Sequence, residues 1–125
     1  MEKLILLDAG HGGIINGQYV TAPKKMFVFP DGFTIYEGVW NRLIVEGIKE
    51  ALKSAGVKFD DIVNSQKDIP LKNRVDRANR LAAEAGPGNT LFISVHANAG
   101  GGNGYEVYTS KGESDSDKIA SNFME

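Results

Sequence analysis

Two short runs of apolar residues stand out in the pattern of hydrophobic and polar positions along the chain. Leu4 to Leu7 is closed by Asp-Ala-Gly, and Leu91 to Val95, interrupted only by Ser94, is closed by His-Ala-Asn. Runs of this length without polar alternation are typical of strands buried on both faces, as in a parallel sheet. We therefore expect a buried strand at each run, with a turn or loop directly after it.

Helical spacing follows the first strand. Thr34 and Glu37 fit the capping-box pattern at a helix start, and Gly56 stops the helix. The positions expected on its buried face recur at helical spacing and are Trp40, Leu43, Ile44, Gly47, Ile48, Ala51, Leu52 and Ala55.

Two further helices are expected. One is capped by Asp68, has Pro70 in its first turn and ends at Ala85, ahead of a Gly-Pro pair. The other runs from Asp115 to Glu125. The apolar spacing of the first of these two helices predicts that it packs against the sheet.

The remaining segments complete the expected architecture. Val57 to Val63 and Tyr105 to Thr109 read as strands, the second after a glycine-rich loop at Gly100 to Gly104. Residues 12–33 form a long loop with a short hairpin around Met26 to Phe29. The order strand, helix, strand, helix, strand, strand, helix indicates an α/β fold: a single domain, residues 1–125, with a mostly parallel twisted sheet flanked by helices.

Composition and charge narrow the classes of function. The chain has 125 residues, and 14 Lys+Arg against 16 Asp+Glu give a net charge of −2. No basic block is longer than a pair, so we expect no nucleic-acid partner. The absence of cysteine excludes a disulfide framework, a thiolate zinc site and a cysteine nucleophile. The apolar start is too short for a signal peptide and no stretch is long enough to span a membrane, so we expect neither.

Both histidines of the chain directly follow an expected buried strand. His11 comes after LILLDAG and His96 after LFISV. Ligands of open α/β sheets bind at this carboxyl edge of the strands. Either histidine alone fits equally well as a loop residue that hydrogen-bonds nearby backbone, but two at one edge favour a shared site.

Glu37 is a third candidate. In a capping box it would accept a hydrogen bond from the Thr34 amide. It also lies three and seven residues before Trp40 and Ile44, on the expected buried face of its helix, where a carboxylate needs a partner. Two imidazoles and one carboxylate form a zinc-binding set that leaves a fourth position open for water, as in catalytic sites.

Five stretches, in chain order, carry a resemblance to a known family. They are LILLDAGHGG, Glu37 at a helix start, LKNRVDRAN, LFISVHAN and GYEVYTS. In these stretches the chain resembles the zinc-dependent N-acetylmuramoyl-L-alanine amidases, the type-3 amidase catalytic domain of bacterial autolysins and phage endolysins. The resemblance covers Leu4 to about Phe123.

The resemblance implies both a site and a reaction. It assigns His11, Glu37 and His96 as Zn²⁺ ligands and Asn98 as a substrate contact, and it gives Arg74, with Ala78 and Asn79, mainly structural roles, against the plainer reading of a solvated helix face. The implied reaction is hydrolysis, by zinc-activated water, of the amide that joins N-acetylmuramic acid to L-alanine in peptidoglycan. The implied place of action is the bacterial cell wall, reached by secretion or by phage release.

The chain departs from the family at the catalytic glutamate, which lies on a strand after the last expected helix. No position matches it. Glu106 is the nearest substitute, although it fits an ordinary strand residue just as well, and Glu113 and Glu125 fit surface charges. Either the chain belongs to a longer enzyme or this form holds zinc without full catalytic competence. We expect a complete enzyme to be monomeric and a truncated one to associate through exposed sheet surface.

The segment between His11 and Glu37 contains an aromatic set that the family often lacks. Its members are Tyr19, Phe27, Phe29 and Phe33. We favour packing of a local hairpin over a wall of the substrate site.

Two other functions stay open. The missing glutamate fits a non-catalytic module that binds muropeptide or zinc. The metal set alone also fits a zinc hydrolase that acts on a different amide.

Overall fold

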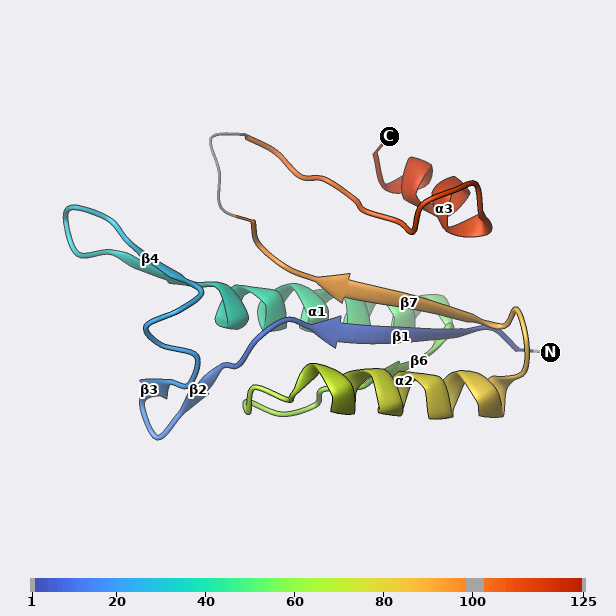
Figure 1. The fold of residues 1–125 in the computed structure, drawn as a ribbon, viewed down its shortest axis with the longest axis horizontal. Coiled ribbons are helices and arrows are strands. Elements are labelled where there is room, and N and C mark those ends of the chain that lie inside the picture. The colour runs from blue at the N-terminus through green and yellow to red at the C-terminus, as the bar shows by residue number, and fades with distance from the viewer. Residues whose placement is uncertain (1, 99–102, 125) are drawn as a thin grey trace.

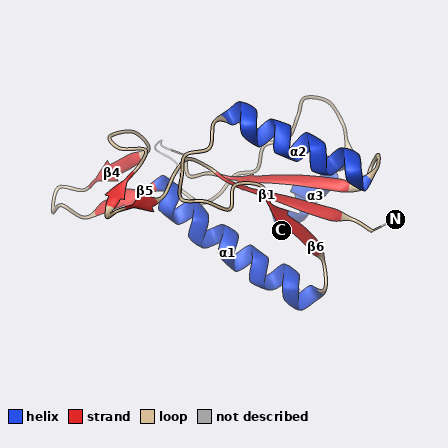
Figure 2. Cartoon of the chain, turned by 90° about the horizontal axis from the view of Figure 1, so that it is seen from below, coloured by secondary structure: helices blue, strands red, loops and turns tan. Residues whose placement is uncertain are grey.

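A three-stranded parallel sheet forms the centre of the protein. The computed structural model describes residues 2–98 and 103–124. Strands β1 (Leu4–Ala9), β6 (Lys58–Asp61) and β7 (Thr90–Val95) pair in the order β6-β1-β7 (Figure 1). Helices α1 (Glu37–Ala55) and α2 (Leu71–Ala85) lie on opposite sides of the sheet (Figure 2). The predicted α/β class, with a parallel sheet flanked by helices, is confirmed.

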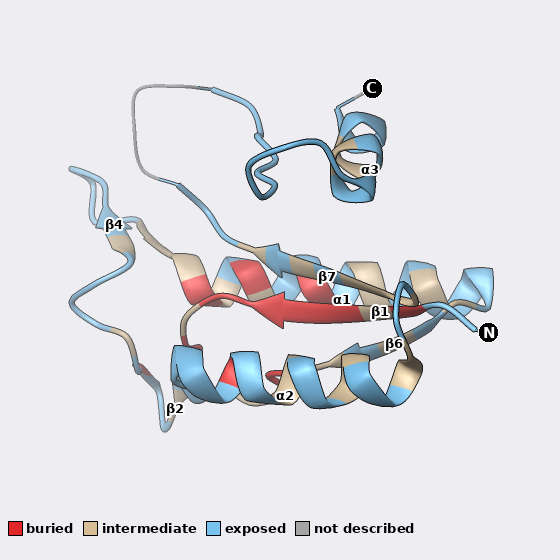
Figure 3. Ribbon diagram, turned by 45° about the vertical axis from the view of Figure 1, so that its right-hand side comes forward, coloured by how far each residue is buried: buried red, intermediate tan, exposed pale blue. Residues whose placement is uncertain are grey.

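Strand β1 supplies side chains to two hydrophobic cores, because alternate residues of a strand point to opposite faces. Leu4 and Leu6 pack under α2 with Ile62, Val63, Ile69, Ala78, Leu81 and Ala85. Leu7 and Ala9 pack under α1 with Val45, Ile5, Ile48, Leu52, Phe59, Ile93 and Val95. Figure 3 shows β1 as the most continuously buried strand. The same alternation places Asp8 on the α2 side, beyond Leu6.

The inward face of α1 differs from the predicted one. Trp40, Leu43 and Ile44 are 47%, 61% and 49% exposed, so their assignment to the buried face is wrong. The buried positions are instead Gly38, Asn41, Val45 and the partly buried Ile48 and Leu52. These positions have the same helical spacing as the predicted ones. The first two are a glycine and an asparagine, so the apolar pattern of the sequence does not reveal them.

The predicted helix starts are also corrected. Thr34 lies in strand β5 (Thr34–Tyr36), and the N-cap of α1 is Tyr36, which makes no side-chain cap hydrogen bond. The capping box is therefore wrong. Helix α2 begins after Pro70, and Asp68 does not cap it. The predicted end of α1 at Gly56 is confirmed, with φ at 69° in the left-handed region that favours glycine.

The long loop after β1 carries two small antiparallel pairs. One joins β2 (Ile14–Ile15) to β3 (Gln18–Tyr19), and the other joins β4 (Met26–Val28) to β5. The second pair confirms the predicted hairpin around Met26 to Phe29. It leads directly into α1 and so places the first residue of that helix.

The chain after β7 departs most from expectation. Tyr105 to Thr109 form no strand, and Tyr105 and Tyr108 are 65% and 76% exposed. Helix α3 (Asp115–Phe123) forms as predicted, although none of its residues is buried. Residues 99–102, which hold most of the predicted glycine-rich loop, and Glu125 lie outside the described residues.

Strand β7 is not buried on both faces as predicted. It pairs with β1 alone among the described strands, and Phe92 is 46% exposed. An edge strand is covered less than a central one, which the apolar run by itself does not reveal. No helix in residues 2–98 or 103–124 is long and apolar enough to cross a membrane.

Candidate metal centre

Three sequence-predicted ligands meet at the carboxyl edge of the sheet. His11 follows β1, His96 follows β7, and Glu37 is the first residue of α1. The Glu37 Oε1 atom lies 3.2 Å from His11 Nε2 and 3.3 Å from His96 Nδ1. One ligand atom from each residue lies within 4.8 Å of the other two. The two imidazole rings contact each other edge to face, with centroids 5.1 Å apart.

Glycines allow the three elements to come this close. A Cβ atom at Gly10 would overlap the imidazole ring of His96, and one at Gly38 would overlap the carbonyl oxygen of Gly12. The first close approach brings the ends of β1 and β7 together, and the second seats the start of α1 on the loop that carries His11. Gly10 and Gly38 are thus required by packing.

The donor set fits Zn²⁺. Bonds of about 2.0–2.1 Å at tetrahedral angles separate ligand atoms by about 3.3 Å, close to the two distances from the Glu37 oxygen. Burial lowers the pKa of His11 below its usual value, and the Glu37 charge opposes this only in part. A lowered pKa favours the neutral imidazole, which is the form that binds metal.

Hydrogen bonds orient the Glu37 carboxylate. Its Oε1 atom accepts from the Ala97 amide at 3.0 Å and from Asn41 Nδ2 at 3.4 Å. The side chain is 12% exposed, against 21% for His11 and 43% for His96. Glu37 therefore faces inward, and its contacts run to the two histidines and their loops and not to the backbone of its own helix start.

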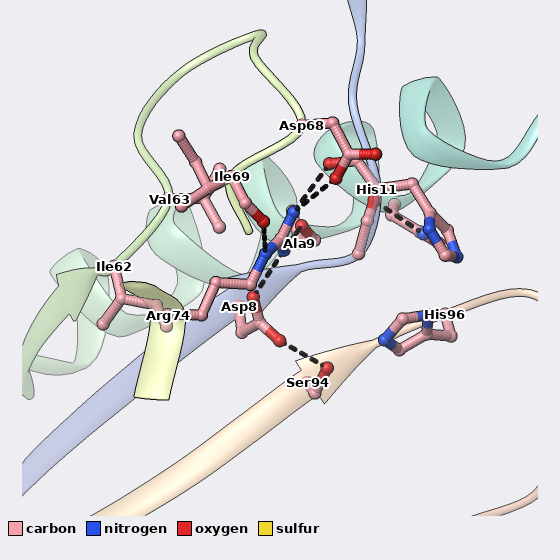
Figure 4. Close-up of polar contacts among 12 residues, drawn as sticks. Asp8, Ala9, His11, Ile62, Val63, Asp68, Ile69, Arg74, Ser94 and His96 are labelled. Carbon is pink, nitrogen blue, oxygen red and sulfur yellow. Dashed lines mark hydrogen bonds and ion pairs between the residues drawn. The ribbon is translucent and has the colours of Figure 1, made fainter. Parts of the chain in front are cut away.

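A buried ion pair supports the strand end on the α2 side (Figure 4). Arg74 Nη1 donates to Asp8 Oδ1 at 2.7 Å, and Ser94 Oγ donates to Asp8 Oδ2 at 2.7 Å. Asp8 and Ser94 are directly opposite in the parallel register. Because Arg74 is only 5% exposed, it is not part of a solvated helix face.

Sequence reasoning missed four residues near the site. They are Asp8, Asn41, Arg42 and Ser94. A signal existed for Asp8 and Ser94, since each is a polar residue at the end of an apolar strand and on the side of a covering helix. Asn41 and Arg42 gave no such signal, because the carbonyls of Gly10 and His11 that they bind lie 31 residues earlier in the chain.

Glu106 and Asn98 lie outside this three-residue cluster. Asn98 Nδ2 donates to Glu106 Oε1 at 2.8 Å. Hydrogen bonds from Asn98 and Tyr108 lower the pKa of Glu106, which makes its carboxylate a weaker proton acceptor. Both residues are exposed. Their roles as base and substrate contact stay predictions.

The aromatic residues before Glu37 divide into two groups. Tyr19 is buried, donates to the Lys25 carbonyl at 2.9 Å and accepts from the Gly38 amide at 3.0 Å, so it ties the loop to the start of α1. Phe27, Phe29 and Phe33 stack on one another but are 58%, 39% and 58% exposed. Packing accounts for Tyr19 and for the mutual stacking, and it leaves the phenylalanine cluster open to solvent.

Comparison with known proteins identifies the family of the chain. The N-acetylmuramoyl-L-alanine amidase family matches residues 5–125. An endolysin of Bacillus phage SPP1 is 32% identical over 113 residues, which are 86% of this chain and 34% of that protein. The chain thus spans about a third of the length of this relative. No solved structure gives a significant match. Because the family match covers nearly the whole chain and includes all three clustered residues, the chain belongs to the N-acetylmuramoyl-L-alanine amidase family, type 3.

Proposed function

We propose that residues 1–125 are the catalytic domain of a peptidoglycan amidase that binds Zn²⁺ through His11, Glu37 and His96. The observation that carries the proposal is the Glu37 carboxylate oxygen set between two imidazole nitrogens at 3.2 and 3.3 Å. The bond cleaved is the amide between the lactyl group of N-acetylmuramic acid and L-alanine. The family match supports this class of substrate.

The zinc ion supplies a Lewis acid for the amide carbonyl and lowers the pKa of a bound water to about 7. The chain's own residues prepare that chemistry. Two imidazoles and one carboxylate would hold the ion and would leave room for a further ligand such as water. The greater exposure of His96 supports entry of the substrate from the β7 side.

Glu106 is the candidate general base in this chain, and Asn98, which donates to it, is the candidate substrate contact. A base at this position takes a proton from the attacking water and passes it to the leaving amine. Glu106 lies outside the cluster of His11, Glu37 and His96, which favours the second candidate function, a module that binds zinc and muropeptide without turnover.

The proposed place of action is the bacterial cell wall. The wall is where the substrate is found, and the match to a phage endolysin supports release by lysis as one route to it. Peptidoglycan and muropeptides are then the partners of this chain.

The proposal is tested on the purified protein with cell walls as substrate. Zinc content is measured first, followed by the appearance of free L-alanine amino groups without new reducing sugar ends. We expect about one zinc per chain and formation of free L-alanine amino groups that a chelator stops and added zinc restores. Glu37→Gln should lose both, whereas Glu50→Gln, an exposed carboxylate on the same helix, should keep both.

Each other outcome selects another function. Binding of zinc and of muropeptide without formation of free L-alanine amino groups would establish that the chain is a non-catalytic module. Zinc-dependent hydrolysis of simple N-acyl amino acids, with no action on walls, would establish a hydrolase of a different amide. Absence of zinc from the wild-type protein would overturn the metal site itself.

A further inference from the structure

His11 is held in an unusual backbone conformation. Its φ angle is 63°, in the left-handed region that a residue with a side chain rarely adopts. Such a conformation is strained and persists where surrounding contacts fix it. Because φ and ψ set the direction of the Cα–Cβ bond, this conformation also sets where the imidazole points.

Two guanidinium groups bind the His11 carbonyl oxygen. Arg42 Nη2, from α1, and Arg74 Nη2, from α2, each donate to it at 3.0 Å. The two helices lie on opposite faces of the sheet (Figure 2). The His11 carbonyl therefore accepts hydrogen bonds from both sides of the sheet. Each guanidinium also binds a carbonyl that precedes His11, Arg74 that of Ala9 at the end of β1 at 2.7 Å and Arg42 that of Gly10 at 3.4 Å.

Arg74 uses all five of its N–H donors. Besides the carbonyls of Ala9 and His11, its acceptors are the Ile69 carbonyl at 2.6 Å, Asp8 at 2.7 Å and Asp68 at 3.3 Å (Figure 4). A fully bonded and buried guanidinium has one allowed position. The carbonyls that it binds are fixed with it.

Arg42 differs because its hydrogen-bond acceptors are all backbone carbonyls. Besides His11 and Gly10 they are those of Ser65 at 2.9 and 3.0 Å, Gly38 at 3.1 Å and Lys67 at 3.2 Å. The two guanidinium groups thus meet at the His11 carbonyl, one held by backbone carbonyls and the other by carbonyls and two carboxylates.

We propose that Arg42 and Arg74 are positioning residues that fix the His11 main chain, and through it the imidazole, in the geometry required to bind zinc. Their joint contact with His11 is named here the arginine clamp. The inference rests on the proposed function, since it assigns the clamp to the zinc site. It predicts that the site is formed before the metal arrives.

Arg42 is the residue to change, because removal of Arg74 would leave the buried Asp8 carboxylate without its charged partner. Arg42→Gln removes most of the donors, and Arg42→Lys keeps the charge but not the planar set of donors. Arg77→Gln is the matched control, since Arg77 is partly buried on α2 and donates to the Ile62 carbonyl at 2.8 Å, away from His11.

Two measurements on the purified protein test the clamp. The first is zinc affinity by competition with a chelator. Loss of a residue that orients a ligand weakens metal binding by about 10–100-fold, so we expect this loss in Arg42→Gln, a smaller one in Arg42→Lys and none in Arg77→Gln. The second is amide hydrogen exchange in the zinc-free protein, where Gly12 and Gly13 should exchange faster in Arg42→Gln alone.

The outcomes separate the clamp from the proposed function. If the wild-type protein binds zinc and Arg42→Gln binds it equally well, the clamp is overturned and the proposed function stands. If the wild-type protein binds no zinc, the proposed function fails, and the claim that the arginines position a zinc ligand fails with it. Faster exchange in Arg42→Gln would then still show that Arg42 fixes the loop, whereas unchanged exchange would remove that claim as well.

Discussion

The two histidines of the candidate metal centre occupy equivalent places after adjacent parallel strands and are held very differently. His11 follows the central strand, its carbonyl is bound by two arginines, and the amides of Gly12 and Gly13 donate to Thr21 Oγ1 and the Gln66 carbonyl. His96 follows the edge strand β7, is 43% exposed, and its neighbour Ala97 donates only to Glu37.

This difference follows from the positions of the strands. A central strand covered by helices on both faces offers many partners to the loop that follows it, and an edge strand offers few. The site thus combines one fixed half and one open half. Glu37 joins the halves, since the same carboxylate oxygen contacts both rings.

The largest expected effect on stability comes from removing the Arg74–Asp8 ion pair, which supports the strand that precedes His11. Arg74→Met leaves the Asp8 carboxylate buried without its partner, so the free energy of unfolding should fall by about 3–5 kcal/mol in urea titrations. Lys72→Met, which removes an exposed pair on the same helix, should leave it nearly unchanged. A loss from Arg74→Met no greater than that from Lys72→Met would contradict the assigned role of the ion pair.

A smaller effect is expected where the two halves touch. Gly10→Ala places a methyl group against the His96 ring, so the ring or the loop must move. Overpacking of this kind costs about 1–3 kcal/mol, and zinc affinity should fall with it. Gly47→Ala on α1, where a Cβ meets nothing within 4 Å, is the control and should be neutral or stabilising. Unchanged zinc affinity in Gly10→Ala would show that the contact does not matter.

A still smaller effect is expected from the link between the two strand ends. Ser94→Ala removes the hydrogen bond to Asp8 Oδ2 and leaves the Arg74 pair in place. The free energy of unfolding should fall by about 1–1.5 kcal/mol. The same substitution in an Asp8→Asn background should cost less, since a hydrogen bond to a neutral amide is weaker. Equal losses in free energy of unfolding in the two backgrounds would contradict a contribution of the hydrogen bond between Ser94 and the Asp8 carboxylate.

The smallest effect on stability is expected from substitutions in the segment beyond His96. Glu106 is exposed and contacts Asn98 and Tyr108, so Glu106→Gln should leave thermal unfolding unchanged. If Glu106 is the base, the formation of free L-alanine amino groups must nevertheless drop sharply, while the zinc content stays unchanged. Full activity in this variant would exclude Glu106 as the base and assign proton transfer to another group.

The sequence predicted the parts of the molecule that depend on local pattern. The apolar run Leu4 to Leu7 indicated the central strand, and the two histidines after such runs indicated the site. The capping box predicted at Thr34 is wrong because this residue lies in strand β5 of a hairpin. The buried face predicted at Trp40 is wrong because Gly38 and Asn41 lie on the buried side of α1 instead. Those outcomes depend on the neighbours that the start of α1 meets.

Residues at the site with partners far along the chain were the hardest to predict. Arg42 binds carbonyls of two loops, and nothing in its local sequence marks it. Arg74 was expected to be structural, but its full set of acceptors appears only once β1 and α2 are placed. The strand at Tyr105 to Thr109 failed for a related reason, since alternation alone supplies no pairing partner.

The measurement that tests the central claim most directly is X-ray absorption at the zinc edge of the purified protein, together with zinc content. The account predicts about one zinc per chain, bound by two imidazole nitrogens and by oxygen, with one imidazole lost in His96→Ala. A protein that binds no zinc, or a zinc spectrum that His96→Ala leaves unchanged, would contradict it.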